Sequence, residues 1–397
     1  MAFDAAQYRL SEPQNQAIFK KWIEPRLFAD AKAVEKPVAV IFGGQPGSGK
    51  SATVDYAMLE LQSHGGAVKI DGDALRLYHP RYKELMRLDD KTAATYTGPD
   101  SGQWVEKAIA GGKARRVNLV IEGTMRSDSA VAATMESLRA AGYEIDARAL
   151  AVNFRLSEQG ILQRYEGQKA DRGIGRMTTP EAHKAAYDGM LVTLERIERD
   201  TLADRVTLYR RGGEAIYTNE LKNGRWVREP QARAQVEAER ARPLTPEQAH
   251  QFVQGYATLV QQLDNPQRNA TEPEKTAMRA RYAQSLEVPI QEEKLQAVVQ
   301  HLNAKGFLQE QQTIILQRCR ANAQWLHEQN PQPGLDAERN RNAPDAHAEP
   351  RMGLANLSNQ YAYMQALTPS ATSQPLHATL PEREAYRQSE PDNGPEP

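Results

Sequence analysis

The stretch "GGQPGSGKS", from Gly43 to Ser51, directly follows the apolar run "VAVIF" at residues 38–42. It fits the pattern G-x-x-x-x-G-K-[ST] from Gly44 to Ser51. Glycine lets a backbone turn tightly and approach a ligand without a Cβ in the way. Between a strand and a helix, the successive N–H groups of such a loop bind phosphate oxygens at the helix N-terminus. The apolar run predicts the strand and residues 51–64 predict the helix, so we expect a site for ATP or GTP here.

The whole loop contributes candidate ligands for the nucleotide. In this pattern the lysine, Lys50, reaches the β- and γ-phosphates, and the hydroxyl of Ser51 holds Mg²⁺. ATP and Mg²⁺ are therefore the expected cofactors. The candidate cofactor-binding residues are Gly44, Gln45, Pro46, Gly47, Ser48, Gly49, Lys50 and Ser51.

Composition narrows the class of protein. The chain has 397 residues, 50 basic and 51 acidic, and this balance argues against bulk binding of nucleic acid. A single cysteine, Cys319, excludes a disulfide framework and favours a reducing compartment. The N-terminus has neither the basic nor the apolar region of a secretory signal, so we expect none. No apolar stretch approaches the roughly 18 residues of a membrane-spanning helix. We therefore expect a cytoplasmic protein of two to three domains that binds neither membrane nor nucleic acid.

Strand-like and helical segments alternate over the first half of the chain. Residues 1–36 predict a helical lead-in, and residues 37–228 predict an α/β domain built as a doubly wound, mostly parallel sheet. In such a sheet the loops that follow the strands lie at one edge, and ligands bind there. The predicted strands are residues 38–42, 67–70, 117–121, 147–152 and 205–209, with helices such as 127–143 and 180–199 between them.

The pattern changes after residue 228. Residues 229–330 predict a small helical region of unknown role, because apolar residues follow a helical spacing in several stretches. One clean helical face runs through 245–263, and further stripes lie at 271–286, 291–307 and 308–326. Ten of the 23 prolines fall in residues 331–397, which predicts a disordered tail, since few large apolar side chains are there to offset the entropy of ordering.

Acidic residues follow two of the predicted strands. Asp71 and Asp73 end the second strand, where one acid can hold Mg²⁺ and the other can accept a proton from an attacking hydroxyl. The sequence Asp-Gly-Asp is also common in turns and at helix N-caps, where it has a purely structural role. Glu122 follows the third strand at the same edge, where it too could serve as a cap.

Two arginines, Arg164 and Arg176, bracket a glycine-containing stretch. Phosphoryl transfer needs positive charge on the γ-phosphate, and the guanidinium fork fits that geometry. The alternative for either arginine is a solvated helix end.

Four stretches in order resemble the zeta-toxin family, the kinase toxins of bacterial toxin–antitoxin systems. They are "KAVEKPVAVIFGGQPGSGKS", "IDGDALRLYHPRY", "NLVIEGTMR" and "RYE…RMTTPEAH", and the resemblance covers about residues 30–220. It implies a P-loop kinase fold and transfer of phosphate from ATP to the sugar 3′-hydroxyl of UDP-N-acetylglucosamine. It also implies a growth-inhibiting toxin with an antitoxin partner.

The resemblance also implies roles for individual residues. Lys50 matches the phosphate-loop lysine, and Asp73 matches the catalytic base. The substrate-binding candidates are Asp73, Glu106, Glu122, Thr124 and Arg126; Arg164 and Arg176 match the γ-phosphate arginines. The interval between the two arginines is one residue shorter than in the family pattern, and "RMTTP" is one residue longer than R-x-T-P.

Three alternatives stay open. The acceptor could be another UDP-sugar or a dinucleotide such as NAD. The chain could be a nucleotide-binding switch or ATPase without an acceptor, although Asp73 speaks against this because a switch needs no acceptor base. It could also be a scaffold whose C-terminal half is the active part and whose kinase domain is degenerate. Against this reading, Lys50, Ser51, Asp73 and Arg164 are all intact.

Overall fold

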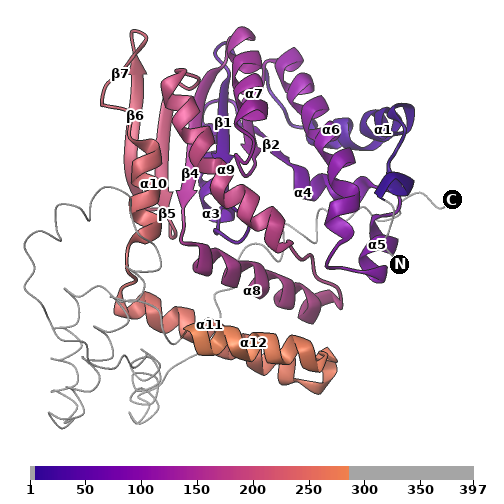
Figure 1. The fold of residues 1–397 in the computed structure, drawn as a ribbon. Helices are drawn as coiled ribbons and strands as arrows, with labels where there is room; N and C mark the ends of the chain where they lie inside the picture. The colour runs from indigo at the N-terminus through magenta and orange to yellow at the C-terminus, as the bar shows by residue number, and fades with distance from the viewer. Residues whose placement is uncertain (1–4, 286–397) are drawn as a thin grey trace, which may run out of the picture. The chain divides into compact units, whose positions relative to one another are not determined.

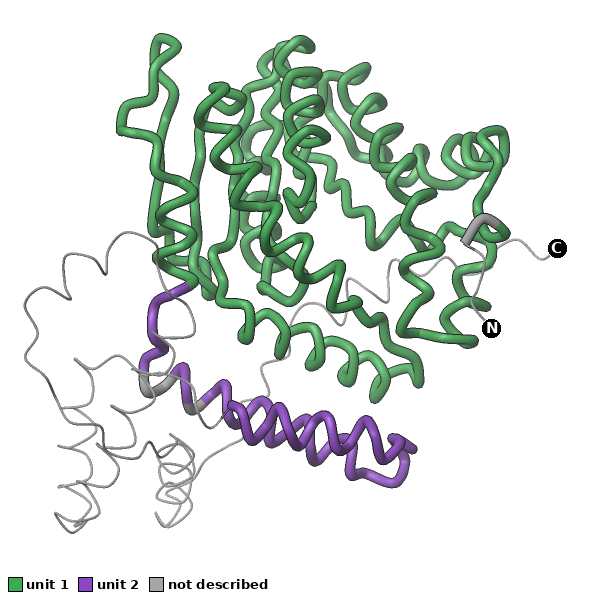
Figure 2. The backbone as a smooth tube through the Cα atoms, in the orientation of Figure 1, with its two compact units in different colours: residues 1–240, 391–397 green, residues 241–390 purple. Residues whose placement is uncertain are grey.

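The computed structural model describes residues 5–285, and this part of the chain divides after Arg240 into two compact units (Figure 2). The helical stripes expected at 291–307 and 308–326, Cys319 and the proline-rich residues 331–397 lie outside the described residues. Within residues 5–285, no helix is both long enough and apolar enough to span a membrane.

The first unit is built on a seven-stranded sheet in the order β2-β3-β1-β4-β5-β6-β7. The first five of these strands run parallel, and β6 and β7 are antiparallel additions at one edge. The doubly wound, mostly parallel sheet and all five expected strands are confirmed, whereas the hairpin of β6 and β7 was not predicted. The strands are β1 (Val38–Gly43), β2 (Val68–Asp71), β3 (Leu119–Glu122), β4 (Glu144–Ala151), β5 (Arg205–Arg210), β6 (Ala215–Lys222) and β7 (Arg225–Trp226).

Helices cover both faces of the sheet because side chains alternate between the faces along each strand. On β1, Val40 and Phe42 pack with α3 (Ser51–Gln62). Ala39 and Ile41 instead join a larger core with α6 (Ala93–Arg115), α7 (Asp128–Ala140) and α9 (Pro180–Arg199). In Figure 1, α7 and α9 pass in front of the sheet.

Short helices precede and interrupt this framework. The helical lead-in expected before residue 36 consists of η1 (Ala5–Tyr8), α1 (Glu12–Ile18), the π-helical turn η2 (Phe19–Ile23) and α2 (Glu24–Leu27). After β2 come α4 (Gly72–Leu75), η3 (Arg76–Tyr78) and α5 (Tyr82–Leu88), and α8 (Phe154–Arg172) follows β4.

The first unit extends beyond the boundary at residue 228 because α10 (Ala232–Ala241) packs into its core. Ala232 and Val236 are fully buried there. The carboxylate of Glu198 accepts a hydrogen bond from the Ala232 N–H at 2.7 Å and another from the Tyr217 hydroxyl at 2.6 Å. A buried acid thus caps α10 and joins it to α9 and β6.

The described part of the second unit contains α11 (Pro246–Asp264), the short 3-10 helix η4 (Pro266–Arg268) and α12 (Glu272–Ser285). The apolar face expected on residues 245–263 is confirmed, since Phe252, Val253, Tyr256, Leu259 and Leu263 are all buried. Arg279 of α12 pairs with Asp264 of α11 at 2.7 Å.

Candidate active site

The phosphate loop joins β1 to α3 and has the backbone that its glycines predict. Gly44, Gly47 and Gly49 have φ angles of +148°, +76° and +88°, which residues with a Cβ rarely adopt. The loop also lies directly on α8. A methyl group on Gly47 would lie 2.0 Å from the carbonyl oxygen of Ser157, and one on Gly160 would lie 2.3 Å from that of Gly47. Glycine is therefore needed on both sides of this contact.

Side chains of the loop point in two directions: Lys50 turns back over the loop, and Gln45 points into the protein interior. Lys50 Nζ donates to the carbonyl oxygen of Gly44 at 2.7 Å, and burial lowers the pKa of Lys50, although the charges of Glu122 and Asp73 oppose this. Ser48 Oγ is buried and has no hydrogen-bond partner among residues 5–285. Gln45 points away from the loop, and its Nε2 donates to the carbonyl oxygen of Val152 at 2.7 Å. Gln45 could therefore meet a nucleotide through its backbone alone.

The acids at the sheet edge come together because their strands are parallel and in register. Asp71 of β2 lies opposite Glu122 of β3. Asp71 Oδ1 accepts the Asp73 N–H at 2.8 Å and so caps α4, as the helix-cap alternative predicts. Burial and the charge of Asp71 raise the pKa of Glu122, whereas the charges of Lys50 and Lys69 lower it.

A metal ion at this edge would need ligands besides carboxylates. In the described part of the chain, no group of three or more His, Cys, Asp and Glu side chains could hold one. Mg²⁺ commonly takes one or two protein ligands together with phosphate oxygens and water. Ser51, the exposed first residue of α3, and Asp71 are compatible with that arrangement.

Asp73 pairs with two arginines. Its Oδ2 lies 2.9 Å from Arg176 Nη2, and its Oδ1 lies 3.1 Å from Arg76 Nε. Burial raises the pKa of Asp73, but the charges of Arg176, Arg76, Arg164 and Lys50 outweigh it and lower the pKa to about 2. The side chain is nevertheless 45% exposed, so an ionised carboxylate remains accessible to a ligand.

Of the two predicted arginines, Arg176 pairs with Asp73, and Arg164 is close enough for its charge to lower the pKa of Asp73. Arg176 precedes α9 and reaches Asp73 despite the altered spacing around "RMTTP". Arg164 Nη2 donates to Thr178 Oγ1 at 2.9 Å, while its Nε is buried with no hydrogen-bond partner in the described chain. Burial and the charge of Arg176 lower the pKa of Arg164 to about 10, so it remains a cation at neutral pH.

The other residues expected at the acceptor side lie in the loop after β3 and on α6. Thr124 is partly buried and Arg126 is exposed in the loop after β3, where Thr193 Oγ1 donates to the carbonyl oxygen of Met125 at 2.7 Å. A methyl group on Gly189 of α9 would lie 2.0 Å from the carbonyl oxygen of Arg126, so this loop is tightly held. Glu106 is exposed on α6.

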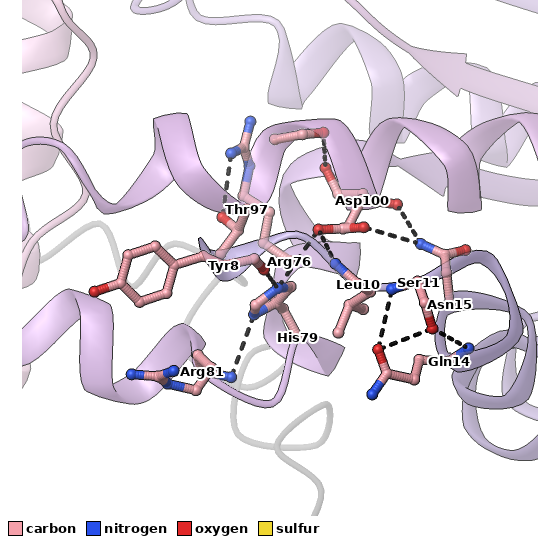
Figure 3. A network of polar contacts seen from close by, with 12 residues as sticks. Tyr8, Leu10, Ser11, Gln14, Asn15, Arg76, His79, Arg81, Thr97 and Asp100 are labelled. Carbon is pink, nitrogen blue, oxygen red and sulfur yellow. Dashed lines mark hydrogen bonds and ion pairs between the residues drawn. The ribbon is translucent and has the colours of Figure 1, made fainter. Parts of the chain in front are cut away.

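Arg76, which binds Asp73 from one helical turn away, was not predicted from the sequence. Arg76 Nη1 donates to the carbonyl oxygen of Ala94 on α6. It also lies 3.5 Å from Thr97 Oγ1 on the same helix (Figure 3). The i, i+3 spacing of Asp73 and Arg76 is the signal that could have revealed the pair, had the helical turn after β2 been predicted.

A buried histidine fixes the same turn to the N-terminal segment (Figure 3). His79 Nδ1 accepts the Arg81 N–H at 3.2 Å, so Nε2 carries the proton that points to the carbonyl oxygen of Tyr8 at 3.0 Å. His79 Nε2 also lies 3.5 Å from Asp100 of α6, and burial lowers the pKa of His79. The turn that carries Arg76 is thus held on two sides.

A second unpredicted cation lies beside the phosphate loop. Arg211, in the turn between β5 and β6, donates from Nη1 to the carbonyl oxygen of Leu156 at 2.9 Å. Its Nε is 3.9 Å from the position of a Cβ on Gly49. No sequence pattern marks this arginine, because the contact depends on the order of the strands.

Comparison with known proteins agrees with this fold. The zeta toxin family model matches residues 26–222. The chain is 35% identical to toxin zeta of Enterococcus hirae over 189 residues, which is 47% of this chain and 65%, slightly under two thirds, of that protein. It is 33% identical to toxin zeta of Streptococcus agalactiae over 210 residues, 53% of this chain and 72% of that protein.

A solved structure shows the same fold. The structure from the PezAT chromosomal toxin–antitoxin system of Streptococcus pneumoniae superposes with a TM-score of 0.55 at 23% identity. The match covers 65% of this chain and all of that one. Toxin PezT of the same species is 30% identical over 187 residues, 73% of that protein. Because relatives at 30% identity or more match it over more than two thirds of their own length, the chain belongs to the zeta toxin family.

Proposed function

We propose that this chain is a kinase that transfers a phosphoryl group from ATP to a sugar hydroxyl of a nucleotide sugar, with UDP-N-acetylglucosamine as the first candidate. The observation that carries the proposal is Asp73, an ionised and accessible carboxylate held by Arg76 and Arg176. It lies at the strand edge that also carries the phosphate loop. A nucleotide switch needs no such acid.

The loop fits a nucleoside triphosphate. A Cβ on Gly44 would lie 3.0 Å from Ser48 Oγ, so a side chain there would fill the space inside the loop. The unpartnered Ser48 Oγ is a buried polar group that phosphate oxygens would satisfy. The residues that would hold the triphosphate are the loop amides and Lys50, with Ser51 and Asp71 on Mg²⁺. When bound, ATP supplies the phosphoryl group and Mg²⁺ neutralises charge on its oxygens.

The chain's own residues would divide the remaining work. Asp73 Oδ1 stays paired with Arg76, which orients the carboxylate. Oδ2 pairs with Arg176, and once Arg176 turns toward phosphate this oxygen can accept the proton of the acceptor hydroxyl. Arg164, whose Nε has no partner in the described chain, adds positive charge beside it. Glu106, Glu122, Thr124 and Arg126 would orient the acceptor.

The relatives indicate a role for this chain in the control of growth. The relatives are toxins, and PezAT is a toxin–antitoxin system. We therefore propose that the chain inhibits growth and that an antitoxin protein neutralises it.

The test is a transfer assay with labelled ATP and a panel of acceptors. Purified protein is incubated with [γ-³²P]ATP, Mg²⁺ and UDP-N-acetylglucosamine, other UDP-sugars, NAD or no acceptor, with Lys50→Ala as the inactive control. We expect the wild-type chain to label UDP-N-acetylglucosamine and the Lys50→Ala variant to label none of the acceptors. Label on NAD would reassign the acceptor, and release of phosphate without any labelled acceptor would overturn the kinase proposal.

A further inference from the structure

A buried arginine lies behind the phosphate loop, on the side away from Lys50. Arg240, near the end of α10, is 4% exposed. Its Nη2 lies 3.4 Å from Gln45 Oε1, and its guanidinium carbon lies 3.6 Å from the centre of the Tyr187 ring. Nε and Nη1 make no hydrogen bond within residues 5–285. Burying a cation with so few partners costs free energy. We therefore expect Arg240 to have a function that offsets this cost.

Gln45 connects this arginine to the nucleotide side of the loop. Its Nε2 donates to the carbonyl oxygen of Val152 at 2.7 Å and lies 3.1 Å from Ser157 Oγ. Its backbone carbonyl oxygen lies 3.4 Å from Lys50 Nζ. The side chain of Gln45 therefore faces Arg240, while its backbone faces the cation that would bind phosphate.

The polar surroundings keep the amide of Gln45 in one orientation. Ser157 Oγ also contacts His183 Nε2 at 2.8 Å. Burial and the charge of Arg240 lower the pKa of His183 to about 4, so His183 is neutral at pH 7 and adds no second cation. With Nε2 directed at a carbonyl and a hydroxyl, Oε1 is left for the donor of Arg240.

We propose that Arg240 is a positioning residue that fixes Gln45, and through it the phosphate loop, and thereby couples α10 to nucleotide binding. The proposal rests on the proposed nucleotide-binding function of the loop. It differs from a general contribution to folding because it predicts a local effect on the loop and on phosphate affinity.

The experiment compares substitutions at two arginines of α10 in the full-length chain. Arg240→Met removes the donors at similar length, and Arg240→Lys keeps the charge. Arg233→Met is the matched control, since Arg233 pairs with Glu195 and Glu237 on the exposed side of the helix. Three quantities are measured: thermal unfolding, affinity for ATP and for inorganic tripolyphosphate, and hydrogen exchange of the amides of residues 44–50 without nucleotide.

We expect Arg240→Met to weaken binding of ATP and tripolyphosphate alike by about tenfold, a common size for coupling between sites. Amide exchange in the loop should accelerate, Arg240→Lys should recover part of both losses, and Arg233→Met should change neither. Gln45→Leu should weaken binding equally, and adding it to Arg240→Met should cause no further loss.

Two results would overturn the proposal: a folded Arg240→Met chain with wild-type affinity and loop exchange, or equal effects from Arg233→Met. If Arg240→Met does not fold, Gln45→Leu decides, and wild-type affinity and exchange in that folded variant would reject the proposal. Loop exchange is measured without nucleotide. It therefore tests this inference even if the wild-type chain fails to bind ATP, a result that would count against the proposed function instead.

Discussion

Gly160 of α8 should be essential for the position of the phosphate loop. A Cβ in Gly160→Ala would lie 2.3 Å from the carbonyl oxygen of Gly47 and 3.2 Å from its Cα. Real Cβ contacts essentially never fall below 3.0 Å, so either the loop or the helix must move by most of an ångström. Both partners are backbone, so neither can rotate out of the way.

The size of the effect follows from two opposing terms. Overpacking a tight contact costs about 1–3 kcal/mol. Replacing a helical glycine by alanine returns about 0.5–1 kcal/mol. The net loss of about 1–2 kcal/mol should lower Tm by roughly 2–8 °C for a unit of this size. Because the loop itself is displaced, ATP affinity should fall by about tenfold or more.

Gly167 provides the matched control on the same helix. Within residues 5–285, no atom outside the backbone of its own helix turn and its chain neighbours lies within 4 Å of the position of its Cβ. Gly167→Ala should therefore stabilise the chain by about 0.5–1 kcal/mol and leave ATP affinity unchanged. Thermal unfolding and equilibrium ATP binding are measured for both variants. If Gly160→Ala is as stable as Gly167→Ala and binds ATP as well, the contact between α8 and the loop does not have the role assigned to it.

Three further predictions concern the acids and the boundary of the first unit. Asp71→Asn should reduce phosphoryl transfer, and raising Mg²⁺ should relieve part of the defect; a defect insensitive to Mg²⁺ would leave Asp71 as a helix cap alone. Burial raises the pKa of Asp73, but Arg176 and Arg76 lower it to about 2, below the value of about 3.9 in unfolded chains, so its ion pairs stabilise the fold above about pH 4. The difference in the free energy of unfolding between wild type and Asp73→Asn should therefore shrink as the pH falls from 4 to 2, and a constant difference in urea titrations would contradict this. Truncation after Ala241 should leave the first unit folded, whereas truncation after Arg228 should cost about 3–6 kcal/mol, from the lost burial of Val236 and the unpaired Glu198; equal Tm values would refute it.

The parts of the site that the sequence predicted follow local patterns. The glycine spacing determines the loop, and the apolar runs before Gly43, Asp71 and Glu122 identify three parallel strands whose carboxyl ends must meet. Arg176 lies 2.9 Å from Asp73 although the spacing there is irregular, and its role at the γ-phosphate stays a prediction.

The parts that the sequence did not predict depend on contacts between distant residues. Arg240 and Gln45 are 195 positions apart, and no periodicity relates them. Arg211 reaches the loop because β5 ends near it. The β6–β7 hairpin did have a local signal, since Asn223 and Gly224 have φ angles of +53° and +73° and form the Asn-Gly turn typical of hairpins.

Single-turnover transfer by Asp73→Asn tests the central claim most directly, because this variant keeps the shape of the side chain and removes its basic oxygen. At saturating ATP and Mg²⁺, with the acceptor found in the panel, the account predicts that transfer falls by about 10²–10⁴-fold. ATP affinity should barely change, since the loop amides and Lys50 provide it. Transfer at a near wild-type rate would contradict the account and would make Glu122 the next acid to test.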